Sequence, residues 1–264
     1  MKKLIFLLIL VIIPLTFLYG QETFNQKDAN GKRQGRWIGK YPDGSIRYIG
    51  LFIDDMPVGE WKRYHKNGNL KAHLFHLPKT NKVAAELFDA EGIRYAIGNY
   101  KGTVKDSTWD YYNNLRLIGK EDFSGGRKNG KSVTFYENGS LATESNWVNG
   151  EPEGVSRSFY PSGKKKSEIM YLMGKRNGPD LSYWESGEIM ISGNYCNNLS
   201  DGIWMFLDRN GVVKYKLVYK AGVLLNPEVA DSIEAGEFKS FDRARGRLKD
   251  PGDFIQSPEE YLRN

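Results

Sequence analysis

The sequence predicts an all-β protein: an elongated antiparallel meander of about eight 24-residue β-hairpin repeats, followed by a short helical C-terminal cap. Three observations lead to this fold class. A turn motif recurs every 24 residues between about residues 28 and 222, and a second glycine nine residues earlier keeps the same period. The 264 residues include 29 Gly, 16 Tyr, 13 Phe and 6 Trp, a composition that favours strands and turns over helices. A fixed period of this size indicates stacked supersecondary units.

The repeat is anchored on one turn position in each unit. Successive turn positions are separated by 24, 24, 24, 23, 24, 24 and 24 residues. Asn-Gly and Asp-Gly pairs at these turns supply the positive φ values that tight hairpin turns require. The turn positions are Gly44, Gly68, Gly92, Arg116, Gly139, Gly163, Gly187 and Gly211, and the earlier glycines are Gly35, Gly59, Gly130, Gly154, Gly178 and Gly202.

Each unit reads as a β-hairpin. A short aromatic strand precedes the turn, as in Gly59-Glu60-Trp61 to Tyr64, and eight units give roughly sixteen strands. A lone hairpin is marginal in water, so we expect each one to bury its aromatic residues against the next. The second strand ends at an aromatic residue eight positions past the turn glycine, at Phe52, Tyr100, Trp147, Tyr171, Tyr195 and Tyr219, with His76 in that place in the second unit.

Two units depart from the pattern. The third, from Val83 to Tyr100, has Ala85 where tryptophan would stand. The fourth lacks the turn glycine and offers Asn113-Asn114, which also tolerates the left-handed conformation. Residues 76–81 precede the third unit, and we expect a loop or kink there.

The first twenty residues have the pattern of a secretory signal peptide. Met1-Lys2-Lys3 precedes an apolar run of 15 residues from Leu4 to Leu18, shorter than the ~20 residues that span a bilayer comfortably. We place cleavage near Gly20-Gln21, with residues 21–27 as a short linker and residues 28–222 as the repeat array. The expected location is periplasmic, cell-surface or secreted; the alternative is an apolar run retained as an anchor.

The pattern stops after Gly222, and residues 223–264 are expected to form a helical cap or tail. Pro227 to Leu248 has helical character, and Asp250-Pro251 is echoed seven residues later by Ser257-Pro258. Asp or Ser before Pro is typical of a helix start. One interpretation is a cap over the last strand, whose open edge would invite aggregation. The other is a docking tail for a partner.

Charge and motifs argue against nucleic-acid, nucleotide and cofactor binding. The net charge is +6, and +4 once Lys2 and Lys3 are removed, which describes a solvated surface. Gly125 to Ser132 satisfies the phosphate-loop pattern G-x-x-x-x-G-K-[ST]. That chemistry needs a helix after the loop, whereas Val133 to Tyr136 reads as a strand. No nucleotide site is expected.

Metal and covalent chemistry are not expected either. His73 and His76 differ by three residues, so on a strand their side chains point to opposite faces and do not share a metal ion. The single cysteine, Cys196, excludes an internal disulfide and is expected to be a partly buried free thiol. The acidic pairs lie in turns, and the sequence indicates no cleft for glycosidase-type carboxylates. The chain is therefore predicted not to be an enzyme.

The pattern G-x-W-x-x-Y-x-x-x-G followed by G-x-Y resembles the MORN-repeat variant of bacterial proteins of the YwqK antitoxin type. It is carried best by Gly59 to Tyr64 with Asn67-Gly68, and by Gly187 with Gly193-Asn194-Tyr195. The resemblance covers residues 28–222. It implies a scaffold, a protein-binding surface or a lipid-binding surface, and the YwqK type implies neutralisation of a toxin protein.

Aromatic residues are the candidate binding groups. Repeated tryptophan and tyrosine first of all pack hairpins together, but an aromatic face left exposed on a single-layer sheet would bind protein, peptide or glycan. We therefore expect a non-catalytic exported scaffold with an unidentified protein partner, the alternatives being a YwqK-like antitoxin or a binder of lipid head groups, a membrane surface or cell-wall glycan. The candidate binding-face aromatics are Trp37, Trp61, Tyr64, Trp109, Tyr136, Tyr160, Trp184 and Trp204.

Overall fold

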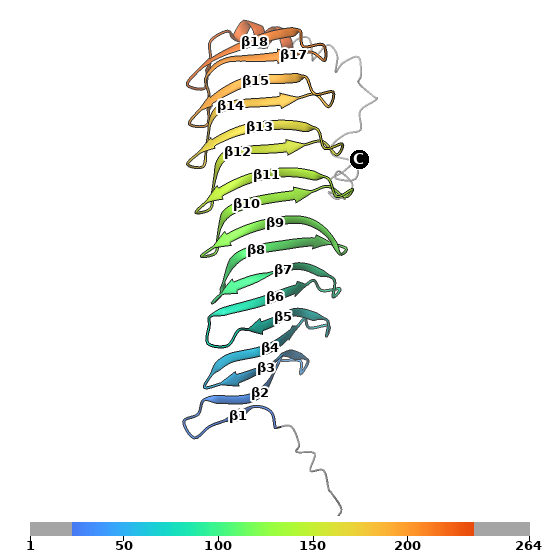
Figure 1. Ribbon diagram of the computed structural model, residues 1–264, viewed down its shortest axis with the longest axis vertical. Coiled ribbons are helices and arrows are strands. Elements are labelled where there is room, and N and C mark those ends of the chain that lie inside the picture. Colours follow the sequence, from blue (N-terminus) through green and yellow to red (C-terminus); the bar gives the residue numbers. More distant parts are fainter. Residues whose placement is uncertain (1–22, 235–264) are drawn as a thin grey trace, which may run out of the picture.

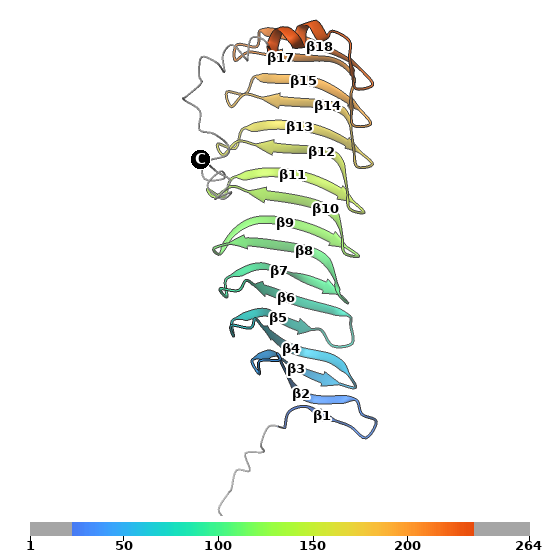
Figure 2. The same ribbon diagram turned by 180° about the vertical axis from the view of Figure 1, so that it is seen from behind.

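The computed structural model describes residues 23–234 as one open antiparallel sheet of 19 strands. Strands that follow one another in the chain lie side by side, stacked along the long axis from β1 to β18 (Figure 1), and the reverse view shows the same order (Figure 2). β16 and β17 are two parts of one interrupted strand, since both pair with β15. The predicted all-β meander is confirmed.

The strands alternate as the two arms of successive hairpins. Their bounds are β1 Gln26–Lys27, β2 Arg33–Lys40, β3 Ile46–Ile53, β4 Met56–Tyr64, β5 Leu70–His76, β6 Lys82–Phe88, β7 Arg94–Lys101, β8 Val104–Asn113, β9 Arg116–Ser124, β10 Arg127–Phe135, β11 Leu141–Val148, β12 Glu151–Phe159, β13 Lys165–Leu172, β14 Lys175–Tyr183, β15 Ile189–Cys196, β16 Leu199–Ser200, β17 Gly202–Leu207, β18 Val213–Lys220 and β19 Val223–Leu224. The eight predicted hairpins run from β2 to β18. A helix follows at residues 227–234.

Two kinds of turn close the strands. Seven hairpins turn on a positive-φ glycine at the predicted positions, such as Gly68 with φ 89°. At the opposite edge, two-residue turns with both φ values positive connect most of the hairpins, as at Asn149-Gly150 with φ 52° and 93°, whereas the β7–β8 turn has a positive φ at Gly102 alone and a loop joins β5 to β6. The fourth hairpin closes on Asn114-Leu115, with φ 46° and 66°, because Asn113 still belongs to β8. The prediction of an Asn113-Asn114 turn was therefore wrong by one residue.

The earlier glycine of the repeat lies in a bulge, as β4 shows. Gly59 has a φ of 61°, and β3 and β4 pair at Ile49–Lys62 and again at Leu51–Val58. Gly50 alone therefore faces three residues of β4, which re-aims the side chain that follows the bulge. Positive-φ residues occupy the same position in six other hairpins: Gly35, Ser107, Gly130, Gly154, Gly178 and Gly202.

The bulge lays a tryptophan ring flat over a glycine of the preceding strand. A Cβ added to Gly50 would lie 2.1 Å from the Trp61 ring, and the same close approach joins Gly98 to Trp109 at 2.3 Å. Gly193 lies under Trp204 in the same way. Each pair is eleven residues apart in the sequence. Each of these three indoles lies where the strand before it offers no side chain.

Other hairpins fill the tryptophan position with small or polar residues. Ser132, Ser156 and Asp180 stand there in the fifth, sixth and seventh hairpins, and Ser132 and Asp180 are buried. Ala85 stands there in the third hairpin, where β6 has no bulge and pairs with β5 without a shift of register. Val83 occupies the bulge position, and a β-branched residue disfavours positive φ. A loop at residues 77–81 joins these strands, as predicted.

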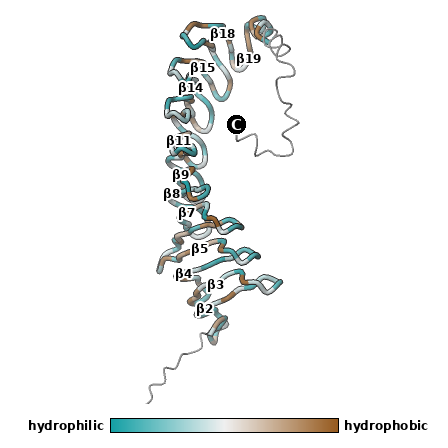
Figure 3. Tube along the Cα trace, turned by 90° about the vertical axis from the view of Figure 1, so that its right-hand side faces the viewer, coloured by the Kyte–Doolittle hydropathy of each residue, from teal (hydrophilic) through white to brown (hydrophobic). Residues whose placement is uncertain are grey.

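The two faces of the sheet differ in chemistry. We call one the tryptophan face: it carries the buried cluster of Ala85, Ala96 and Trp109, against which Leu74 and Tyr100 pack. The hairpin aromatics meet here as predicted, with ring centroids 4.9 Å apart for Tyr100 and Trp109. We call the opposite face the ladder face. In profile the array is a narrow column whose turns carry many hydrophilic residues (Figure 3).

Asparagine side chains close both ends of the sheet. At the C-terminal end, Asn226 Nδ2 donates to the carbonyl of Lys216 at 2.9 Å, and its Oδ1 accepts from the N–H of Val218 at 2.8 Å. At the N-terminal end, Asn25 Oδ1 accepts from the N–H of Ile38 at 2.8 Å. Each asparagine occupies edge groups that another strand would otherwise pair with. The segment after β19 thus acts as a cap at residues 225–226.

Several predictions fall outside the described residues. These are the signal peptide at residues 1–20 and the two proline-led turns beyond residue 249. The predicted helix from Pro227 to Leu248 is described only to residue 234. Within residues 23–234 the structure has no helix long and apolar enough to span a bilayer.

Candidate functional site

Three of the candidate binding-face tryptophans are buried. Trp61, Trp109 and Trp204 are only 8%, 0% and 9% exposed, because each ring is covered in its place over a glycine. They pack hairpins together and offer no surface to a partner, so their assignment to an exposed binding face was wrong. Trp37 lies half-buried on the same face, and its Nε1 donates to the carbonyl of Gln34 at 3.1 Å.

The remaining candidates lie close to the turns. Tyr136 Oη donates to the carbonyl of Phe159 at 2.7 Å, and Tyr160 Oη donates to the carbonyl of Tyr183 at 2.7 Å. Each of these tyrosines therefore fastens its hairpin to the next. Tyr64 and Trp184 are half-buried, and the Arg209 guanidinium lies 5.3 Å from the Trp184 ring centroid. The structure does not gather the eight aromatics into one surface.

The ladder face instead carries a row of aligned side chains that sequence reasoning missed. One residue from each successive strand stands directly opposite the next, with rungs about 4.8 Å apart. The row, which we call the charged ladder, runs through Ile38, Ile49, Lys62, His73, Glu86, Ile97, Asp110, Lys120, Val133, Glu144, Arg157, Glu168, Leu181, Ser192, Met205 and Lys216. Positive and negative side chains follow one another along much of it.

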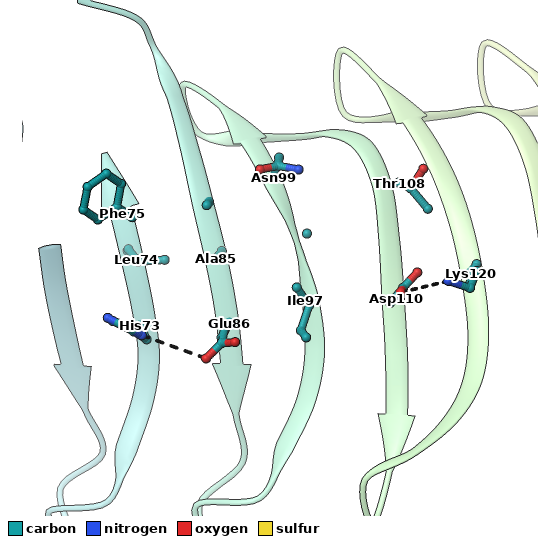
Figure 4. A pocket seen from close by; sticks show the side chains of 12 residues that line it. His73, Leu74, Phe75, Ala85, Glu86, Ile97, Asn99, Thr108, Asp110 and Lys120 are labelled. Carbon is teal, nitrogen blue, oxygen red and sulfur yellow. Dashed lines mark hydrogen bonds and ion pairs between the residues drawn. The ribbon is translucent and has the colours of Figure 1, made fainter. Parts of the chain in front are cut away.

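An open groove of about 720 Å³ crosses the ladder face from β5 to β9. His73 and Glu86 line one end and Asp110 and Lys120 the other, with Ile97 between them (Figure 4). The small residues Ala84 and Gly98 belong to the lining, so side chains fill little of its middle. We call this hollow the ladder groove.

Contacts between basic side chains and carboxylates hold the polar groups of the ladder groove. His73 Nε2 lies 2.9 Å from Glu60 Oε1, and its Nδ1 lies 3.9 Å from Glu86 Oε2. Lys120 Nζ lies 3.0 Å from Asp110 Oδ2. The hydrogen bonds from Lys62 and His73 lower the pKa of the Glu60 carboxyl. All of these side chains remain accessible to solvent, so a bound molecule could replace one of the partners in each pair.

A second charged cluster lies further along the same face. Arg157 Nε bonds Glu168 Oε1 at 2.7 Å, and its Nη1 bonds Glu144 Oε1 at 3.1 Å. Lys165 Nζ adds a bond of 2.8 Å to Glu168 Oε2. Lys165 and Arg157 together lower the pKa of Glu168 to about 2. Because the pairs are mutually satisfied, this part of the ladder is locked, whereas the ladder groove is open.

The other sequence motifs can now be placed. Gly125-Gly126 is the turn between β9 and β10, and Arg127 to Phe135 is strand rather than helix, so the phosphate-loop pattern is a coincidence of the repeat. His73 contacts carboxylates on the ladder face, while His76 packs its ring against Trp61 on the tryptophan face. Cys196 is exposed, so the expectation of a partly buried thiol was wrong. Among the described residues no group of three or more metal-ligating side chains is assembled.

Comparison with known proteins gives one family match. Residues 57–76, 128–149 and 152–172 match the MORN repeat variant, and they fall on β4–β5, β10–β11 and β12–β13. No curated protein sequence matches the chain.

Likeness to solved structures is slight. A TarM mutant from S. aureus, in complex with fondaparinux, α-GlcNAc-glycerol and UDP, has a TM-score of 0.29 at 10% identity over 40% of this chain and 21% of that one. A GtfA/B complex has a TM-score of 0.25 at 15% identity, over 33% of this chain and 18% of that one. The chain spans about a fifth of those proteins' lengths. These structural similarities are too low to support an argument. The conclusion therefore rests on the family match: at three places the chain is similar to the MORN repeat variant, which indicates a repeat-type binding module.

Proposed function

We propose that the protein is a non-catalytic, exported scaffold that holds another protein against its ladder face. The observation that carries this proposal is the ladder groove: an open hollow whose two ends present His73 with Glu86 and Asp110 with Lys120. Charged side chains that are paired yet accessible favour selective protein contacts, because complementary charges steer and orient a partner. The export component rests on the N-terminal signal pattern.

The geometry supports binding better than catalysis. Glu86 and Asp110 are separated by the Ile97 rung, so their strands lie about 9–10 Å apart. Each carboxylate already has a cationic partner within 4 Å, Arg94 for Glu86 and Lys120 for Asp110. The alternative is a YwqK-like antitoxin, in which the bound partner is a toxin protein. A cytoplasmic location of the mature chain would favour this alternative.

An exchange of charges tests the groove while keeping its internal ion pair. In the variant Asp110→Lys with Lys120→Asp the two partners trade places, so the pair persists but the polarity shown to a partner is reversed. A matched control makes the same exchange at an exposed pair beside the turns, Arg116→Glu with Glu137→Arg, whose atoms lie 3.9 Å apart. Thermal unfolding establishes that both variants are folded.

The measurement is a cross-linked pull-down of tagged residues 21–264 from envelope and secreted fractions. We expect a stoichiometric protein partner that the wild type and the control retain and that the groove exchange loses. Retention of that partner by the groove exchange would remove the ladder groove from the interface. Retention on membrane or wall material, with no protein partner, would replace the proposal with lipid or glycan binding. The same fractions test export, since a mature N-terminus near Gln21 is expected.

A further inference from the structure

The tryptophan face has a hollow at the third hairpin, where the repeat lacks its indole. In neighbouring hairpins a ring lies over the residue eleven positions earlier, as Trp109 lies over Gly98. The corresponding pair in the third hairpin is Ala85 and Leu74, so the third hairpin has no indole of its own at this position. An open hollow of about 420 Å³ is found at this place, lined by Leu74 with Val83, Leu87 and Tyr100.

The hollow continues to the edge of the sheet. A second hollow of about 740 Å³ shares His76 and Val83 with the first and lies against the 77–81 loop. Its lining is largely apolar and includes Met56 and Leu77, which are 61% and 39% exposed. We call the two together the vacancy groove. Apolar side chains left exposed in a concave surface indicate a site that another molecule covers.

The charged side chains that line the vacancy groove are all basic. Arg63 and Lys71 line its inner part and Lys79 its outer part, and no Asp or Glu is among its described lining residues. The ladder groove on the other face differs, since there Lys120 and His73 each face a carboxylate. The missing counter-charges must come from solvent or from whatever occupies the vacancy groove, and an anionic occupant is favoured.

We propose that the vacancy groove binds an acidic segment of a partner protein and takes up one of its aromatic side chains in the place of the missing tryptophan. The apolar floor over Leu74 and Val83 buries the ring. Arg63, Lys71 and Lys79 pair with carboxylates on either side of it. This inference rests on the proposed function of a protein-binding scaffold and names a partner chemistry for the face opposite the ladder groove.

The repeat itself supplies the variant that fills the groove from within. Ala85→Trp with Leu74→Gly places an indole and a glycine at the positions of Trp109 and Gly98, and the further change Val83→Gly permits the positive φ of the bulge that β6 lacks, so a ring of the chain's own is set over the hollow. A second variant, Arg63→Gln with Lys71→Gln, keeps the apolar floor and removes two cations. The exchange of Asp110 and Lys120 on the ladder face serves as the control that leaves the vacancy groove intact.

The probes are three labelled pentapeptides, Asp-Glu-Trp-Glu-Asp, Asp-Glu-Ala-Glu-Asp and Lys-Lys-Trp-Lys-Lys, titrated onto residues 21–264 by fluorescence anisotropy. We expect the acidic tryptophan peptide to bind at least tenfold more tightly than the other two, and more weakly as salt is raised. Filling the groove and removing its cations should each lower that affinity at least tenfold. The ladder-face control should not change it.

Three results would overturn the inference. These are equal affinity for the tryptophan and alanine peptides, undiminished binding to the filled variant, or no binding of any acidic peptide by folded protein. Binding of vesicles of anionic phospholipid that the filled variant retains would assign the basic residues to a membrane surface instead. If the protein fails these peptide tests but still binds a protein partner through the ladder face, this inference is wrong and the proposed function remains.

Discussion

Replacing Gly98 with alanine tests the rule that each buried indole lies over a glycine. The new Cβ would lie 2.3 Å from Cδ2, 2.4 Å from Cε2 and 2.6 Å from Cγ of Trp109, well inside van der Waals contact. The ring is 0% exposed, so it moves only by displacing its neighbours. Overpacking of this kind costs about 1–3 kcal/mol. Displacement also breaks the bond from Trp109 Nε1 to the carbonyl of Asn99 at 3.0 Å, worth about 1 kcal/mol.

We therefore expect Gly98→Ala to lower the free energy of unfolding by about 2–4 kcal/mol, as measured by urea denaturation followed by circular dichroism. The matched background is Trp109→Ser, which copies the serine that the sixth hairpin carries at the tryptophan position. Without the ring, alanine at residue 98 is expected to be neutral or to stabilise by about 0.5 kcal/mol, since glycine is unfavourable within a strand. An equal loss in both backgrounds would refute the rule, because the cost would then belong to the strand and not to the ring.

Three further predictions concern the sheet edge, the tyrosine fasteners and the charged cluster. Asn226→Ala frees the N–H of Val218 at the last long strand, so we expect concentration-dependent association in light scattering; a variant that stays monomeric would count against the edge role. Tyr136→Phe removes the bond to the Phe159 carbonyl and should cost about 1 kcal/mol in urea unfolding, whereas an unchanged midpoint would deny the tyrosine its fastening role. The pKa of Glu168 is about 2 in the folded chain against a usual 4.5, so the folded state binds fewer protons there. Its contribution is complete above pH 4.5, and it is lost as pH falls from 4.5 towards 2; Glu168→Gln should flatten the loss of stability in that window, and an identical pH profile would contradict the pairing.

The hairpin array could be predicted because its determinants are local. A positive-φ turn needs particular residues at particular places, so Gly68 and its equivalents mark the turns directly. The loop before the third hairpin could be predicted because the third unit departs from the repeat pattern there, with Ala85 at the tryptophan position. The pairing of Trp109 with Gly98 was also within reach of the sequence, since it recurs at a spacing of eleven residues in three hairpins.

The candidate site was harder to predict because it depends on register. Alternation along a strand tells which side chains share a face, but the bulge at Gly59 places three residues opposite one and re-aims Trp61 into the core. For that reason the sequence alone does not tell which of the repeated aromatics pack between hairpins and which face outward. The charged ladder likewise appears only when each strand is aligned with both neighbours, since His73 and Glu86 come from different hairpins.

The uneven distribution of indoles along the array has a consequence for how it comes apart. A sheet built from hairpins that contact only their neighbours behaves as a line of coupled links, and the weakest coupling decides where it separates. The links at Ser132, Ser156 and Asp180 have no ring laid across them, whereas the hairpins of Trp61 and Trp204 do. Amide hydrogens of β10 to β14 should therefore exchange before those of β3 and β4. Strain along the column would then be taken up near its middle, with the two ends remaining intact as separate folded blocks.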